Sequence, residues 1–251
     1  MLFPMMMFQN IRNEAEEQKK RVEACKYRSE DWDEDKTKFN TSLVLNGATW
    51  KPYKVFRLRR TTLPGAEDRL NKGKTSPSGK FTYVHQILPA GGVLKLAQGR
   101  NRRGEVFFTE DVIIPTLLEG NQIWMSYTPS EIITQRGGVR RATGTVLVGG
   151  LGMGWMLRKI AAKKSVKKII LVEIEQDLMD FYGNKMVGKI RQETGVEIEV
   201  HVGDVWDHVG KHGADVRHIL DIWPSYPAYP NRNERAIIST VRHFWGWGVQ
   251  L

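Results

Sequence analysis

The chain has 251 residues, enough for one large domain or two modest ones. It is 41% hydrophobic and 26% charged, which is ordinary for a globular protein, and its single cysteine, Cys25, excludes a disulfide framework. No apolar run reaches the roughly 18 to 20 residues of a membrane span, and the apolar start lacks the basic segment of a signal peptide. We therefore expect a cytoplasmic protein that does not cross a membrane.

The net charge of +10 favours a polyanionic partner such as nucleic acid. Because Lys and Arg recur throughout the chain, the sequence identifies no single basic surface, and charge that only keeps the protein soluble is the alternative. The six histidines show no metal-ligand spacing, so we expect no metal site. The sequence leaves a homo-oligomer open.

The first 140 residues divide into two parts. Residues 1–40 hold Glu-to-Lys and Glu-to-Arg pairs at helical spacing over 9–38, which predict a charged helical arm. Residues 41–140 have short β-like runs broken by turns, which predict a small antiparallel β domain. The predicted strands cover 42–47, 53–58, 81–88, 92–96 and 105–114, and 71–79 has the composition of a loop.

Residues 141–251 alternate strand-like and helix-like segments. The predicted strands cover 145–149, 168–173, 197–202 and 214–222, and the predicted helices cover 154–164, 175–193, 204–211 and 234–244. This alternation predicts parallel βαβ units, so the fold class is α/β with a doubly wound, mostly parallel, Rossmann-like sheet. The residues after 244 are too few for the closing strands of a full sheet of this class. Either the sheet is short, or its edge is covered by a partner or by the β domain.

The most informative segment is 145–154, where a run of aliphatic residues ends in glycines at 150, 152 and 154. A strand, a glycine turn and a helix bring bare backbone close to a nucleotide-like ligand in open α/β sheets. Ligands of such sheets bind beyond the carboxyl ends of the strands, so the residues that close the strands should line one site. These are the three glycines, Glu173, Gly203 with Asp204, and Asp221.

The kind of nucleotide follows from what the turn lacks. A nicotinamide-binding fingerprint, G-x-G-x-x-G, would place its third glycine at Trp155, and the chain has no Gly-Lys-Ser/Thr phosphate loop. Glu173 closes the second strand, where a carboxylate can accept hydrogen bonds from both ribose hydroxyls. Asp204 would add a carboxylate that suits an uncharged adenosine better than a pyrophosphate. The pattern favours S-adenosylmethionine or a related compound as the cofactor.

The region from 144 to about 230 resembles a class I S-adenosylmethionine-dependent methyltransferase, and more closely the spermidine-synthase-like branch of that fold. The matching segments are Val146–Gly154, Leu171–Glu175, Val200–Asp204 and Leu220–Pro224. Upstream, 94–117 resembles the β-rich lead-in of that branch. Trp124–Glu131 resembles a lead-in of methyltransferase-like proteins, many of them phage-encoded, and for a phage protein the location would be the host cytoplasm.

The resemblance implies how the cofactor is bound. It implies that Glu173 binds the ribose and that Asp204 and Val205 lie at the adenine. The residues that it places under the methionine or ribose portion are Gly150, Gly152 and Gly154.

The resemblance also implies a catalytic role for Asp221, which would face the transferred group. The segment that begins there lies where enzymes that methylate amino groups of nucleic acid carry an Asp-Pro-Pro-Tyr run. By this analogy Trp223 and Tyr226 would stack an acceptor base, while Asp221 accepts its N–H. The alternative is that both aromatic residues only pack the rim of the sheet.

Two alternatives to methyl transfer stay open. Aminopropyl transfer is one, but spermidine synthases hold their cationic ligands with an acid in the glycine loop and another after the fourth strand, and these positions are Met153 and Pro224 here. The chain also departs from the methyltransferase pattern, because Val148 stands where methyltransferases usually carry the acid that opens the first motif. The other alternative is a nucleotide-binding or interaction protein without activity.

Overall fold

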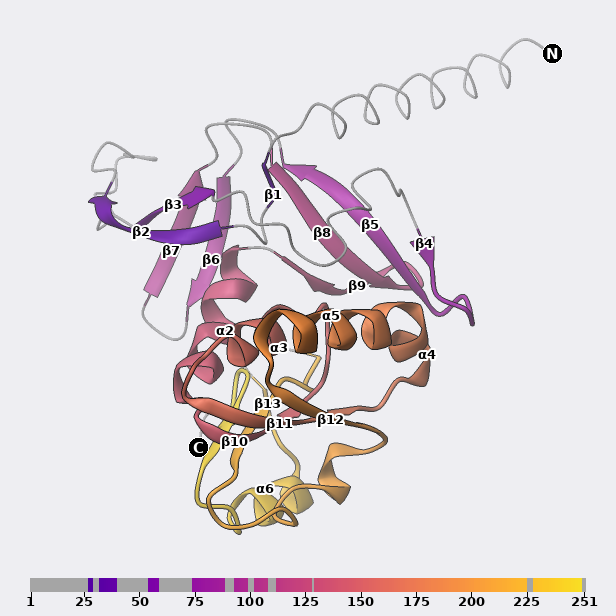
Figure 1. Cartoon of the computed structure of the whole chain (residues 1–251). Helices are drawn as coiled ribbons and strands as arrows, with labels where there is room; N and C mark the ends of the chain where they lie inside the picture. The colour runs from indigo at the N-terminus through magenta and orange to yellow at the C-terminus, as the bar shows by residue number, and fades with distance from the viewer. Residues whose placement is uncertain are drawn as a thin grey trace, which may run out of the picture.

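The computed structural model of the chain has a parallel sheet and an antiparallel sheet with helices between them (Figure 1). It describes residues 27–28, 32–39, 54–58, 74–88, 93–98, 102–107, 112–127, 129–224 and 228–249.

The carboxyl-terminal half forms a five-stranded parallel sheet. In the order of their pairing, the strands are β12 (Glu197–Val202), β11 (Val166–Glu173), β10 (Gly144–Gly149), β13 (Arg217–Leu220) and β14 (Phe244–Gly246). Every pairing in this sheet is parallel. The strand order reverses between β10 and β13, which is the switch point where doubly wound sheets bind ligands. The predicted parallel α/β class and its first four strands are confirmed.

Helices cover both faces of this sheet (Figure 1). On the face toward the antiparallel sheet lie α2 (Pro129–Arg141), α3 (Trp155–Ala161), α4 (Gln176–Leu178), a π-helical turn (Met179–Gly183) and α5 (Asn184–Thr194), and on the other face lies α6 (Arg232–Ile238). No helix in the described part of the chain is long and apolar enough to cross a membrane.

The central strands are apolar because both of their faces are buried. In β10, Val146 and Val148 point into the core shared with α3 and α5, whereas Leu147 points into a second core with Ile170 and Val172 of β11. Parallel strands covered on both faces read as continuous aliphatic runs instead of alternating patterns. This is why the sequence predicted these two strands well.

The antiparallel sheet comes from residues before α2. Its pairing order is β1 (Tyr27–Arg28), β8 (Val112–Glu119), β5 (Phe81–Leu88) and β4 (Lys74–Thr75), and β9 (Gln122–Ser126) pairs with β8. Two separate hairpins join β2 (Trp32–Phe39) to β3 (Lys54–Leu58) and β6 (Val93–Gln98) to β7 (Arg102–Phe107). The pairs β4–β5, β5–β8 and β8–β9 are antiparallel, as predicted for this part of the chain.

Several predicted elements differ from the structure near the amino terminus. The predicted helical arm is wrong over 32–39, which form β2 and pair with β3, so these charged residues are held by a partner strand. Residues 1–26 and the predicted strand 42–47 lie outside the described residues. The predicted strand 105–114 is two strands, β7 and β8, with different partners.

The helix α2 was missed because its sequence contains Gly137 and Gly138, which disfavour helices. Packing explains both glycines. A Cβ on Gly138 would lie 2.7 Å from the ring of Trp245 and 2.8 Å from Ile219, and a Cβ on Gly137 would lie 2.8 Å from Trp245. The glycines let α2 approach β13 and β14 closely, so tertiary contact overrides local propensity here.

Two predicted helices are shorter than expected. The segment 204–211 contains only a 3₁₀ turn, Val205–Asp207, in which the Asp204 side chain accepts a hydrogen bond from the backbone N–H of Trp206. The predicted helix 234–244 stops at Ile238, and Phe244 begins β14. This short strand covers the edge of β13 that the sequence left without a partner.

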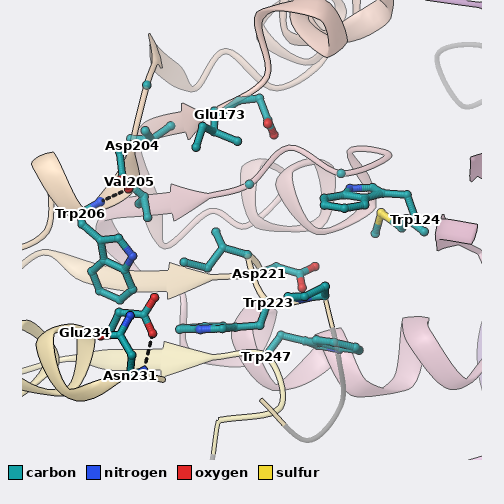
Figure 2. Close-up of a pocket in the computed structure, with 18 of the residues that line it drawn as sticks. Trp124, Glu173, Asp204, Val205, Trp206, Asp221, Trp223, Asn231, Glu234 and Trp247 are labelled. Carbon is teal, nitrogen blue, oxygen red and sulfur yellow. Dashed lines mark hydrogen bonds between the residues drawn. The ribbon is translucent and has the colours of Figure 1, made fainter. Parts of the chain in front are cut away.

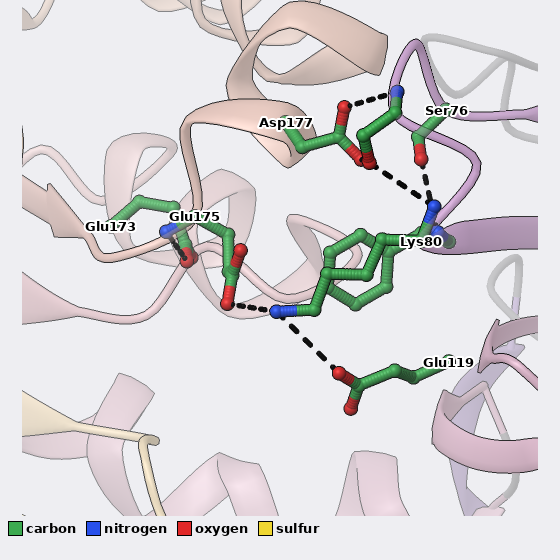
Figure 3. Close-up of polar contacts among 8 residues, drawn as sticks. Ser76, Lys80, Glu119, Glu173, Glu175 and Asp177 are labelled. Carbon is green, nitrogen blue, oxygen red and sulfur yellow. Dashed lines mark hydrogen bonds and ion pairs between the residues drawn. The ribbon is translucent and has the colours of Figure 1, made fainter.

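A polar junction ties the antiparallel sheet to the loop that follows β11 (Figure 3). In the turn between β4 and β5, the backbone N–H and the hydroxyl of Ser78 donate to the two carboxylate oxygens of Asp177 at 2.9 and 2.6 Å. The Nζ of Lys80 lies 2.5 Å from Oε1 of Glu175 and 3.5 Å from Oε1 of Glu119. The loop that begins at the end of β11 is therefore held from the other sheet.

The two sheets also share one hydrophobic core. Phe81 of β5 and Leu117 of β8 belong to the same buried cluster as Leu157 of α3 and Ile190 of α5. The helical layer is thus packed against strands of both sheets.

Replacing Phe81 by alanine should therefore weaken both sheets together. Phe81 is 0% exposed, and truncating a buried Phe costs about 3–5 kcal/mol. We expect Phe81→Ala to lower the free energy of unfolding in urea by that amount, in one transition seen equally by circular dichroism and tryptophan fluorescence. Tyr229→Ala, at a residue 75% exposed, is the control and should change it by less than about 0.5 kcal/mol. A separate early transition would contradict the shared core.

Candidate functional site

A pocket of about 570 Å³ opens at the carboxyl ends of β10, β11, β12 and β13 (Figure 2). This volume is in the range of small-molecule sites. Of the residues predicted from the strand ends, the pocket brings together Gly150, Gly152, Glu173, Asp204, Val205, Asp221 and Trp223. Gly154 is not among the lining residues, and Tyr226 lies outside the described residues.

The glycines of the turn are required by the packing of the protein itself. Gly150 and Gly152 have φ values of 87° and 49°, a conformation that favours glycine. A Cβ on Gly150 would collide with the backbone of Asp221, and one on Gly152 would lie 2.5 Å from Sδ of Met125. Gly154, predicted to lie beside the ligand, instead precedes α3 and lies against the side chain of Met186.

Most backbone polar groups of the turn already have partners in the protein. The N–H groups of residues 150 and 154 donate to the carbonyls of Val172 and Leu151, respectively. The N–H group of residue 151 donates to Oε2 of Glu173, and that of residue 153 donates to Sδ of Met125. The carbonyl of residue 152 accepts from the hydroxyl of Tyr182, and that of residue 153 accepts from the hydroxyl of Tyr127. A pyrophosphate needs several N–H groups that point at the ligand. These four N–H groups are therefore not available to a pyrophosphate.

Glu173 holds the end of β11 against the glycine turn. The residue is 5% exposed, and its Oε2 accepts from the N–H of Leu151 at 2.6 Å while Oε1 accepts from the N–H of Glu175 at 2.9 Å. Burial raises the pKa of the carboxyl group, and these two hydrogen bonds oppose that rise. Each carboxylate oxygen has a second lone pair, so the group can still accept a hydrogen bond from a ligand hydroxyl.

The end of β12 forms the neighbouring wall. Oδ1 of Asp204, an exposed residue, accepts from the N–H of Trp206 at 3.0 Å, so the carboxylate also has a structural role as the cap of the 3₁₀ turn. Val205 is buried and packs against β10, where a Cβ on Gly149 would lie 2.8 Å from its Cγ2. A flat ligand placed here would meet aliphatic and aromatic surface with one carboxylate at its edge.

The end of β13 meets a polar face of α2 that the sequence did not predict. Nε2 of Gln135, a residue 1% exposed, donates to Oδ2 of Asp221 at 2.7 Å. Glu131 lies one helical turn earlier, and its Oε2 accepts from the N–H and the hydroxyl of Ser126 at 2.9 and 3.1 Å. Loss of solvation raises the pKa of Asp221 to about 7 and that of Glu131 to about 8, where the nearby charge of Asp221 contributes further.

Four of the eight tryptophans of the chain line this pocket, which concentrates aromatic surface there (Figure 2). Trp124 is 47% exposed at the mouth, and the rings of Trp206 and Trp223 meet edge to face with centroids 6.2 Å apart. Nε1 of Trp247 donates to the hydroxyl of Thr134 at 2.8 Å. Nε1 of Trp223 is buried without an acceptor among the described residues.

The lining is acidic although the chain is strongly basic. The carboxyl groups in it are those of Glu131, Glu173, Asp204, Asp221 and Glu234, and none of the described lining residues is Lys, Arg or His. Such a pocket favours cationic or neutral ligands and disfavours phosphates. Within the described residues, no three His, Cys, Asp or Glu side chains are placed to hold a metal ion.

Replacing Glu173 by glutamine should destabilise the protein even without a ligand. Glutamine offers an NH₂ group to one of the two backbone donors, and an unsatisfied buried donor costs about 1–3 kcal/mol. We expect urea titration of Glu173→Gln to show a loss of this size. In the control Glu175→Gln, only a partly exposed ion pair with Lys80 is weakened, and the loss should stay below about 1 kcal/mol. Equal stability of wild type and Glu173→Gln would contradict the bridging role of the carboxylate.

No family model and no curated protein matches the chain. Among solved structures, it is distantly similar to a spermidine synthase from Thermotoga maritima, with 15% identity and a TM-score of 0.34 over 62% of this chain and 55% of that chain. It is also similar to a Δ1-pyrroline-2-carboxylate reductase from Thermococcus litoralis, solved with NADH and L-proline, with 10% identity and a TM-score of 0.28 over 60% and 51%. The match thus spans about half the length of either protein.

Proposed function

We propose that the pocket binds S-adenosylmethionine and that the protein transfers its methyl group to an acceptor. The observation that carries the proposal is the acidic, tryptophan-lined pocket at the switch point of a parallel sheet. A sulfonium is a cation, and carboxylates and tryptophan faces both attract cations. A nucleotide with phosphates would instead bring negative charge against this acidic lining, most strongly above neutral pH, where Asp221 and Glu131 ionise.

The residues present fit this cofactor at three points. Glu173 keeps acceptor capacity toward the pocket, which suits ribose hydroxyls. Asp204 and the buried Val205 offer an acceptor beside apolar surface, which suits the adenine. The engaged N–H groups of the glycine turn would leave a pyrophosphate without donors, whereas an adenosyl sulfonium needs none of them.

Bound S-adenosylmethionine supplies a methyl group that is already activated, so the protein needs mainly to position the acceptor and exclude water. In this proposal Asp221 takes a proton from an acceptor nitrogen, and its pKa of about 7, at which a carboxyl group exchanges protons near neutral pH, supports that role. Gln135 orients the carboxylate through Oδ2. Trp223 and Trp247 line the same end of the pocket and provide surface against which an acceptor can pack. These charges favour a neutral or cationic acceptor.

Aminopropyl transfer is the second candidate, and one observation favours it. No Lys or Arg among the described lining residues faces the carboxylate of S-adenosylmethionine, and a decarboxylated donor would lack that group. Against it stands Met153, which is 3% exposed in the core, so this position of the turn cannot supply the acid that holds the donor amine in spermidine synthases. Methyl transfer therefore remains the first candidate.

Calorimetric titration of the full chain with S-adenosylmethionine, decarboxylated S-adenosylmethionine and S-adenosylhomocysteine tests the proposal. We expect micromolar binding of the first and weaker binding of the uncharged thioether product. Tenfold preference for the decarboxylated donor would replace methyl transfer by aminopropyl transfer. No binding of any of the three would reject both activities and leave a protein that uses the fold for another purpose.

The affinity for S-adenosylmethionine should rise with pH. The pKa values of Asp221 and Glu131, about 7 and about 8, leave both carboxyl groups largely protonated below neutral pH. A cationic ligand favours their ionised forms, so binding releases protons and tightens as the pH rises through these values. We expect roughly tenfold tighter binding at pH 8.5 than at pH 6.5. Calorimetry in two buffers of different ionisation enthalpy measures the protons released and the change of affinity with pH. S-adenosylhomocysteine is the control ligand. An affinity for S-adenosylmethionine that does not change with pH would contradict the linkage.

Replacing Asp221 by asparagine should weaken binding while stabilising the free protein. The raised pKa means that the folded state binds a proton more tightly than the unfolded state, so stability falls as the pH rises from about 4 to about 7. Asparagine removes this penalty and keeps an oxygen for Gln135. We expect the melting temperature at pH 8 to rise by about 2–4 °C for each kcal/mol gained, with no rise near pH 4. A lower melting temperature at pH 8, or unchanged affinity, would contradict the assigned role.

A further inference from the structure

The amino-terminal edge of the parallel sheet carries charge opposite to that of the pocket. Because all five strands run in one direction, the residues that precede or begin them gather at one end of the sheet. We call six of these residues the basic edge. They are Arg140 and Arg141 before β10, Lys163, Lys164 and Lys167 around the start of β11, and Arg217 at the start of β13.

The charges of the basic edge are not neutralised within the part of the chain that the structure describes, where no carboxylate forms an ion pair with any of the six. Nζ of Lys163 donates to the Val139 and Arg140 carbonyls at 2.6 and 3.1 Å, which fixes it at the end of α2. Burial lowers the pKa of Lys163, and the charge of Arg217 lowers it further, so these two cations lie near each other.

The acids that lie at this end do not cancel the patch. Glu197 and Glu199 of β12 both bind Lys168, at 2.8 and 2.9 Å, and are thereby occupied. Glu193, in the last turn of α5 before β12, pairs with Arg158 at 2.7 Å. Asp215 is exposed in the loop before β13 and is a single acid against six cations. Arg140, Arg141, Lys164 and Lys167 are all exposed, so their charges are available to a partner. Uncompensated cations that stay exposed along one edge of a sheet fit a partner with regularly spaced anions.

The surroundings distinguish between a phosphate backbone and a membrane. Membrane binding by a basic surface is strengthened by apolar side chains that insert beside the charges. The large hydrophobic residues exposed in the described part of the chain are Ile123, Trp124, Ile174, Val202 and Tyr229. Ile123 and Trp124 belong to β9, Trp124 and Ile174 line the pocket, and Tyr229 precedes α6. Ile174 directly follows β11 and Val202 ends β12, so both lie at the carboxyl ends of the strands, away from the basic edge. A surface of charge alone matches the phosphates of nucleic acid.

We propose that the basic edge binds the phosphate backbone of a nucleic acid. Neighbouring strands are about 4.8 Å apart, so the starts of β11, β10 and β13 present cations across about 10 Å, a width that spans a few phosphates. The length of β10, six residues, separates this edge from the pocket by about 20 Å. Nucleic acid bound here anchors the protein and places no base in the acidic pocket.

The test is fluorescence anisotropy of a labelled 20-base-pair DNA duplex with the full chain and two variants of equal charge change. In Lys164→Glu/Lys167→Glu the basic edge is reversed. In Lys185→Glu/Arg232→Glu the reversed residues are exposed and begin α5 and α6, at the pocket end of the sheet. We expect at least tenfold weaker binding for the first variant and less than about twofold change for the second. With about four phosphate contacts, wild type should lose about 100-fold in affinity between 50 and 200 mM salt, and the first variant about tenfold.

Three outcomes would overturn the proposal: no duplex binding at 50 mM salt, an equal loss in both variants, or binding of phosphatidylserine vesicles in preference to the duplex. Circular dichroism of each variant shows that it is folded. Nucleic-acid binding at the basic edge does not depend on the methyltransferase proposal, because calorimetry with S-adenosylmethionine measures ligand binding in the pocket independently. Lys164→Glu/Lys167→Glu should keep the wild-type affinity for that ligand, whatever its value.

Discussion

The buried carboxylate of Glu173 is the constraint on which the site depends. Its two oxygens accept from the N–H groups of Leu151 and Glu175, so one side chain fixes the glycine turn after β10 and the loop after β11. Burying a carboxylate is costly, and charge-assisted hydrogen bonds to backbone donors offset much of that cost. The same loop is held from outside by Lys80 through Glu175. The antiparallel sheet therefore stabilises the pocket without lining most of it.

Where the sequence predicted the site, the signal was local. Aliphatic runs identified β10 and β11, and in a parallel sheet the residues that close the strands must share one edge, which brought Glu173, Asp204 and Asp221 into one pocket. Glu131 and Gln135 could not be found in this way. The hydrogen bond between Gln135 and Asp221 joins residues 86 apart in sequence. The helix that carries Gln135 contains two glycines, which disfavour a helix in the sequence and are explained only by tertiary packing.

The glycine turn shows the limit of a motif more directly. Its glycine spacing does not match the nicotinamide-binding fingerprint, and the N–H groups of residues 150, 151, 153 and 154 are occupied within the protein. Yet the residues that replace the familiar acids, Val148 and Met153, are 0% and 3% exposed, so both positions face the core. A carboxylate at either place would be buried among apolar side chains. The acids that line the pocket come instead from α2, from the ends of β11, β12 and β13, and from α6.

Net charge conceals the arrangement that matters most for partners. The excess of +10 describes the whole chain, but strand direction separates the charges in the parallel sheet, with acids at the carboxyl ends and the basic edge at the amino ends. Composition cannot reveal such a separation, because it depends on which residues precede and follow each strand. A cationic ligand would be drawn toward the pocket and a polyanion toward the opposite edge. Under both proposals, one parallel sheet binds two partners of opposite charge at its two ends.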